Sequence, residues 1–110
     1  MEDMILSGTF NLAMSVEVAE HILPDKNDVF VENLAKASNR YIVLTAAPPG
    51  QHGTGHINCQ EKEYWRDKIE ASGFEYKESE VKNLKIELKK VIPRSNPAVN
   101  NIMFFKKESK

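Results

Sequence analysis

Two short polar segments hold the residues with the clearest chemistry. In the first, Glu17, Glu20 and His21 stand at positions i, i+3 and i+4, a spacing that one helical turn places on a single face. In the second, His56 lies in a glycine-rich stretch that is expected to face the first segment. Two carboxylates and two imidazoles suit Mg²⁺, Mn²⁺ or Zn²⁺ better than Ca²⁺. Glu17, Glu20, His21 and His56 are therefore the predicted metal ligands.

A simpler interpretation competes with the metal site. Glu17 and Glu20 can be solvated surface carboxylates, and His21 can cap the turn. Cys59 follows His56 in an H-x-x-C pattern, but a structural zinc site needs more cysteine or histidine ligands than this pattern supplies. We interpret Cys59 as a packing residue and His52 as a loop residue rather than a catalytic base.

Hydrophobic periodicity predicts the elements that carry these segments. Alternation in residues 10–16 places large apolar side chains on one face and small groups on the other, which predicts a strand covered on both sides. The nearly continuous apolar run at 41–47 is typical of a central parallel strand. The other predicted elements are helices at 26–37, at about 60–72 and from 78 toward Pro93, a short strand at 75–76 and a final strand at 102–105.

This order of elements predicts an α/β fold with a largely parallel sheet and helices on both faces. Ligands of such sheets bind beyond the carboxyl ends of the strands. The polar segments 15–21 and 46–58 follow two predicted strands directly, so we expect them on the same rim. The chain has 110 residues, which suffices for one domain and not for two.

Composition excludes several functional classes. The formal net charge of -1 makes nucleic acid an improbable partner, because no overall positive field attracts phosphates. No apolar run approaches the roughly 20 residues that span a bilayer, so no membrane partner is expected. The first residues, MEDMILSG, carry acids where a secretory signal needs basic residues. With a single cysteine, the sequence predicts a cytoplasmic protein.

Both polar segments resemble motifs of one enzyme family. Residues 15–22, SVEVAEHI, follow a strand that begins FNL and resemble the FDLxxSxEVxEHI signature of class I S-adenosylmethionine-dependent methyltransferases. Residues 53–58, GTGHIN, together with Tyr64 and Trp65, resemble a GGxGHxN…YW pattern in one branch of that family. The resemblance covers about residues 8–76. It implies a partial Rossmann-like methyltransferase sheet, mostly parallel, with an antiparallel C-terminal strand.

The resemblance also implies an activity. Family members transfer the methyl group of S-adenosylmethionine, here to the oxygen of a small hydroxylated acceptor, with His21 and His56 as catalytic residues. Some relatives use a similar E-x-x-E-H cluster to hold a metal that lowers the pKa of the acceptor hydroxyl. The resemblance places Ser15, Val16 and Glu17 beside the methionine part of the cofactor.

The sequence departs from the family in the part that binds the rest of the cofactor. Family members use a glycine-rich loop after their first strand and an acidic residue at the end of the second, and the 110 residues contain neither. Residues 1–110 are therefore interpreted as a single partial domain, the C-terminal half of a methyltransferase. Two functions stay open: an enzyme that is incomplete as an isolated chain, or a non-catalytic remnant or subunit that acts as an interaction module.

The expected protein partner binds at the strand formed by residues 10–16. Without the family's first strand, this strand becomes an edge with unpaired backbone groups and no lysine or proline to protect it. The partner is then either a separately encoded N-terminal half or a second copy of the chain.

Overall fold

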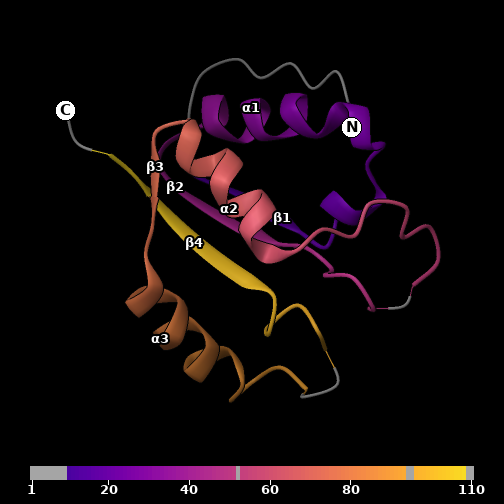
Figure 1. The fold of residues 1–110 in the computed structure, drawn as a ribbon. Coiled ribbons are helices and arrows are strands. Elements are labelled where there is room, and N and C mark those ends of the chain that lie inside the picture. Colours follow the sequence, from indigo (N-terminus) through magenta and orange to yellow (C-terminus); the bar gives the residue numbers. More distant parts are fainter. Residues whose placement is uncertain (1–9, 52, 94–95, 109–110) are drawn as a thin grey trace.

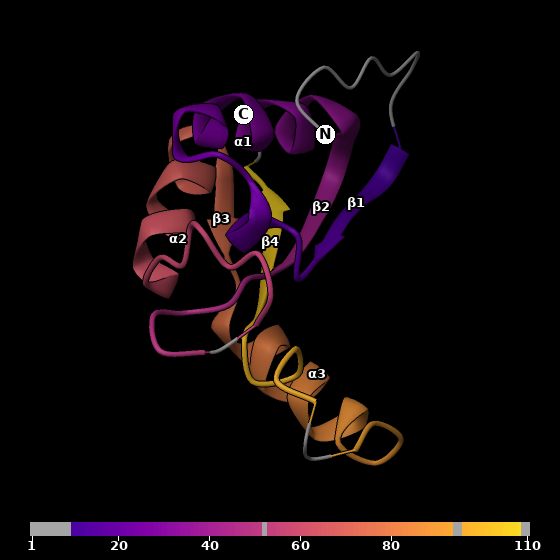
Figure 2. The ribbon, with the colours of Figure 1, turned by 90° about the vertical axis from the view of Figure 1, so that its right-hand side faces the viewer.

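A four-stranded sheet forms the centre of the computed structural model, which describes residues 10–51, 53–93 and 96–108. The elements are labelled in Figure 1, and the strand order β1-β2-β4-β3 is visible in Figure 2. β1 runs parallel to β2, whereas β4 runs antiparallel to both β2 and β3. The strands are β1 (Phe10–Val16), β2 (Ser38–Thr45), β3 (Phe74–Tyr76) and β4 (Ile102–Lys107).

The α/β class and the antiparallel C-terminal strand are confirmed, but the prediction of a mostly parallel sheet is wrong. Only the pair β1–β2 is parallel, and the sheet is mixed. The chain re-enters the sheet at the carboxyl end of β2, where Ile102 pairs with Thr45. From that end β4 can only run in the opposite direction to β2. Residue periodicity identifies a strand but carries no information about its direction.

The helices lie close to their predicted positions. α1 and α2 end within one residue of the predicted ends, whereas α3 ends before Pro93, at Leu88. None of the helices among the described residues has the length and apolar character needed to cross a membrane. The helical elements are the short 3-10 helices η1 (Ala19–His21) and η2 (Pro24–Lys26) and the α-helices α1 (Asn27–Ala37), α2 (Lys62–Ala71) and α3 (Glu78–Leu88).

Helices cover both faces of the sheet, as predicted (Figures 1 and 2). On one face, α1 and α2 pack against the inner side chains of β2 and β4, and Trp65 and Ile69 of α2 are fully buried there. On the other face, Val81 of α3 packs against Val43 and Ile102. The core on the first face is therefore much the larger of the two.

β1 is less covered than its sequence predicts. It is the edge strand, as predicted from the absence of the family's first strand (Figure 2), and its small residues Ala13 and Ser15 point into the larger core. Its large side chains lie on the opposite face and are about half exposed. The prediction of a strand covered on both sides is wrong, because α3 packs against β4 and leaves the β1 side of that face open.

Candidate metal centre

The two polar segments meet at the carboxyl ends of β1 and β2, as the sequence analysis predicts. The backbone N–H of Glu17 donates to both the carbonyl and the hydroxyl oxygen of Thr45, each at 2.9 Å. Glu17 has a φ of 51°, a left-handed conformation that non-glycine residues seldom adopt. The chain turns there, and η1 begins only at Ala19.

Three side chains converge behind this turn. The Oε2 atom of Glu20 lies 3.8 Å from Nε2 of His21 and 3.8 Å from Nε2 of His56. One ligand atom from each of the three residues lies within 4.8 Å of the others. The Glu20 side chain is 1% exposed and that of His56 13%, whereas that of His21 is 42% exposed. The group is thus buried on the Glu20 side and open to solvent beside His21.

Backbone carbonyls orient both imidazoles. Nδ1 of His21 lies 2.9 Å from the carbonyl oxygen of Gly55, and Nδ1 of His56 lies 3.0 Å from that of Gln51. A carbonyl oxygen can only accept a hydrogen bond, so Nδ1 is the donor in each ring. In the neutral imidazole this leaves the Nε2 lone pair free. Both free lone pairs therefore belong to the nitrogens that approach Glu20, an arrangement that metal-binding histidines share.

Among the described residues, only one of the two carboxylate oxygens of Glu20 has a hydrogen-bond partner. Its Oε1 accepts a hydrogen bond from the N–H of Ala47 at 3.2 Å, while its buried Oε2 has no hydrogen-bond partner among the described residues. A separation of 3.8 Å from each histidine is too long for a hydrogen bond. A buried carboxylate oxygen without a partner is costly, and here it faces the Nε2 atoms of both imidazoles. This donor set fits a divalent cation.

A bound cation would draw the three ligand atoms, which lie within 4.8 Å of one another, closer together. Tetrahedral zinc with ligand distances of about 2.0–2.1 Å holds its ligand atoms about 3.3 Å apart. The two Glu20–histidine separations are 3.8 Å, so each would shorten by roughly 0.5 Å on zinc binding. The exposed side of His21 leaves room for water or a substrate oxygen as a further ligand.

Hydrogen bonds hold the loop that carries His56, between β2 and α2, against the turn that carries Glu20. The carbonyl oxygen of Glu20 accepts from the N–H groups of Ile57 and Asn58, at 3.0 and 2.9 Å. The buried amide of Asn58 donates to the side chain of Asn27 at 2.6 Å, and Asn27 donates to the hydroxyl of Tyr64 at 2.7 Å. Asn27 was not among the predicted site residues, because a polar residue at a helix start is most simply solvated.

Two glycines make room for the imidazoles. A Cβ atom on Gly53 would lie 2.5 Å from Nε2 of His56, well inside contact distance. Gly55 has a φ of 77°, and a Cβ there would lie 3.1 Å from Nδ1 of His21. The G-x-G-H pattern is therefore explained by the position of the two histidines.

Replacing Gly53 with alanine is expected to weaken Zn²⁺ binding at least about 10-fold, the scale of losing an orienting partner, because the new methyl group displaces His56. Thr54→Ala is the matched control in the same loop, because Thr54 is exposed. Zinc titration by competition with a chromogenic chelator measures both variants. Equal zinc affinity in the two would contradict the arrangement described here.

The fourth predicted ligand, Glu17, lies outside this group. Its carboxylate accepts hydrogen bonds from Thr45 Oγ1 at 3.0 Å, Gln51 Nε2 at 3.0 Å and Asn101 Nδ2 at 3.4 Å. The left-handed turn at Glu17 interrupts the helical spacing on which its assignment depended. Glu17 instead ties the end of β1 to the loop after β2 and to Asn101, a residue that the sequence did not single out.

The three predicted cofactor-binding residues do not share one surface. Ser15 is buried at 4% exposure, and its hydroxyl has no hydrogen-bond partner within the described part of the chain. Val16 is 48% exposed and points to the opposite face, because neighbouring residues of a strand alternate. Glu17 follows in the turn. Ser15 and Glu17 thus lie at the rim end of β1, but Val16 contributes to the exposed face of that strand.

The remaining sequence candidates are placed as follows. Burial, followed by the nearby charges of Glu20 and Glu17, raises the pKa of the Cys59 thiol, which favours the protonated, non-ligating form. Trp65 is a core residue, as expected. His52 falls outside the described residues.

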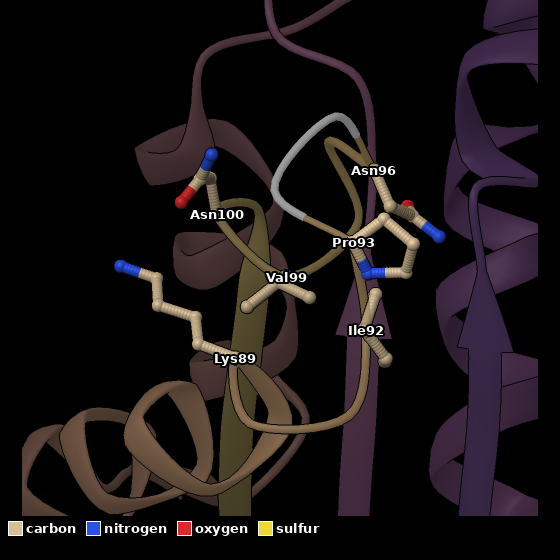
Figure 3. A pocket seen from close by; sticks show the side chains of 6 residues that line it. All are labelled: Lys89, Ile92, Pro93, Asn96, Val99 and Asn100. Carbon is tan, nitrogen blue, oxygen red and sulfur yellow. The ribbon is translucent and has the colours of Figure 1, made fainter.

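A separate cavity of about 450 Å³ lies beside the end of α3 (Figure 3). Lys89 and Asn100 stand on one side of the buried Val99, and Ile92, Pro93 and Asn96 on the other. None of the four predicted metal ligands lines this cavity. This cavity is therefore separate from the candidate metal centre.

Comparison with known proteins gives no family assignment. No family model matches the chain, and no curated protein matches it significantly. The group formed by Glu20, His21 and His56 is accordingly defined by its geometry.

Proposed function

We propose that this chain is the C-terminal part of a class I S-adenosylmethionine-dependent methyltransferase domain. It would transfer a methyl group to the oxygen of a small hydroxylated molecule, assisted by a divalent cation. The observation that carries the metal assignment is the convergence of Glu20 Oε2 with the Nε2 atoms of His21 and His56. The methyltransferase assignment depends on the motif resemblance.

The arrangement of the two motif segments supports this assignment. The SVEVAEHI and GTGHIN segments are more than 30 residues apart in sequence, yet they are joined by hydrogen bonds from Ile57 and Asn58 to Glu20. They also lie beyond the carboxyl ends of two parallel strands, where α/β enzymes bind their ligands. The antiparallel β4 agrees with the C-terminal strand that the resemblance implies.

Each side chain of the group has a distinct role in this proposal. A bound cation would act as a Lewis acid that lowers the pKa of the acceptor hydroxyl. The buried Glu20 supplies the negative charge that selects a cation, and the Gly55 and Gln51 carbonyls keep both Nε2 lone pairs directed at it. His21 is the exposed member, so the acceptor approaches from its side.

The isolated chain is expected to bind S-adenosylmethionine weakly and to contact only the methionine end of this cofactor. The family's glycine-rich loop is not among the 110 residues, so the adenosine part has few partners. In saturation-transfer NMR with S-adenosylmethionine, we expect the strongest transfer to the S-methyl and methionine protons. Glu17→Gln should reduce that transfer several-fold, because Glu17 lies at the rim where the resemblance places the methionine part.

The matched control is Asp67→Asn, which removes one exposed charge on α2 and should leave the transfer unchanged. Absence of transfer, or strongest transfer to adenine, would overturn the cofactor assignment. The interaction-module alternative would then be favoured, since the half-exposed apolar side chains of β1 provide a surface for a protein partner.

A further inference from the structure

The outer face of the edge strand is unusually apolar for a surface. Four side chains of β1 lie on the face opposite α1 and α2 and are here called the β1 stripe: Phe10, Leu12, Met14 and Val16, with exposures of 56%, 44%, 57% and 48%. β1, of sequence FNLAMSV, contains no charged residue and no proline. Edge strands of monomeric proteins normally carry such residues to prevent pairing with other chains.

The β1 stripe has neighbours on one side only. Within the sheet, Leu12 lies beside Tyr41 and Met14 beside Val43. On the outer side no described strand pairs with β1, so its outward N–H and C=O groups are free to pair with a further strand. A partner strand would place new side chains next to the stripe, at the distance where cross-strand pairs make contact.

The apolar–polar pattern of β1 is the same in both directions. Around Ala13 it reads apolar, polar, apolar, small, apolar, polar, apolar in both directions. Two antiparallel copies related by a two-fold axis at Ala13 therefore align Phe10 with Val16 and Leu12 with Met14. Asn11 aligns with Ser15 on the other face. A shift of one residue would put the two stripes on opposite faces, so this register is favoured.

We propose that β1 is a homodimer interface in which two copies pair antiparallel about Ala13. The two four-stranded sheets then form one continuous sheet, and the two stripes merge into a single apolar surface. A second copy is the occupant because an isologous interface requires a self-complementary patch. β1 meets that condition at every position, and its lack of charge means that identical strands do not repel each other.

In the dimer, each copy keeps its own group of Glu20, His21 and His56. In each copy, Glu20 and His21 follow directly after the carboxyl end of β1. In an antiparallel pair these ends point in opposite directions, about 20 Å apart for seven residues at roughly 3.3 Å each. The interface therefore leaves both rims open, and it can exist whether or not the chain is a methyltransferase.

Sedimentation equilibrium of the full chain tests the interface. We expect a reversible monomer–dimer equilibrium with a dissociation constant in the micromolar range, and a shift of at least about 10-fold toward monomer for Leu12→Lys/Met14→Lys. Both positions are exposed, so the variant should keep the wild-type circular dichroism spectrum. Ile86→Lys is the control, because Ile86 is at least as exposed, at 59%, but lies on α3.

A disulfide experiment tests the register. In a Cys59→Ser background, Leu12→Cys/Met14→Cys should form covalent dimers under mild oxidation, because residue 12 faces residue 14 of the second copy. Phe10→Cys/Leu12→Cys should not, because those positions face residues 16 and 14. A monomer at all concentrations, a dimer or larger aggregate that the lysine variant does not dissociate, or equal crosslinking of both pairs would overturn the proposal.

Discussion

Replacing Glu20 with glutamine is expected to abolish metal binding while leaving the metal-free protein as stable or more stable. Zn²⁺ and Mn²⁺ affinity should fall by more than about 100-fold, beyond the 10–100-fold typical of losing an outer partner of a metal ligand, because the only carboxylate of the group is lost. Without metal, the new amide can donate to a histidine Nε2, which stabilises the fold by on the order of 1 kcal/mol.

This pair of opposite effects distinguishes a metal site from a structural residue. Thermal unfolding with and without Zn²⁺ measures both. At 100 times the dissociation constant, a bound cation stabilises the folded state by about 2.7 kcal/mol, and this gain should disappear in Glu20→Gln. Glu32→Gln is the matched control, since it removes one exposed carboxylate on α1, and it should bind zinc like the parent. If Glu20→Gln and the parent are stabilised equally by zinc, Glu20 is not a ligand.

Replacing Trp65 with alanine is expected to reduce the free energy of unfolding by about 3–5 kcal/mol. Trp65 is fully buried, and its ring makes edge-to-face contacts with Phe30 at 5.8 Å and Tyr64 at 5.0 Å. The substitution leaves a large cavity between α1 and α2, and Tyr64 loses a contact that supports its hydrogen bond with Asn27. Because domains are stable by only about 5–15 kcal/mol, the variant should be close to unfolding at 37 °C.

Urea denaturation measures this loss and separates its causes. Trp65→Phe should cost less than Trp65→Ala, because it keeps an aromatic ring and removes an indole N–H that has no partner among the described residues. Val91→Ala, at a position that is 78% exposed, should change stability by no more than about 0.5 kcal/mol. A loss below about 1 kcal/mol for Trp65→Ala would contradict a central role in the core.

Local patterns were sufficient to predict the elements. The helices α1 and α2 were found from apolar positions at helical spacing, and Trp65 was correctly interpreted as a core anchor. The loop between β2 and α2 was found from its glycines and prolines. These features depend on residues close together in sequence, whose preferences for helix, strand or turn act before any distant contact forms.

The sequence also located most of the candidate site. The rule that ligands bind beyond the carboxyl ends of parallel strands placed the Glu20 turn beside the glycine-rich loop, and the structure brings Glu20, His21 and His56 together there. Helical spacing failed for Glu17, because a left-handed turn precedes η1. That turn is held by hydrogen bonds from Glu17 to Thr45, a residue 28 positions later in the chain.

The tertiary structure alone decided the mixed character of the sheet, the uncovered face of β1 and the orientation of the two imidazoles. Each depends on groups far apart in sequence: Ile102 against Thr45, α3 against β4, and the Gly55 carbonyl against His21. An alternating strand pattern shows which side chains share a face, but not whether a helix covers that face. Likewise, the types of ligand residues suggest a cation, but only the two backbone carbonyls fix which nitrogen lone pairs face Glu20.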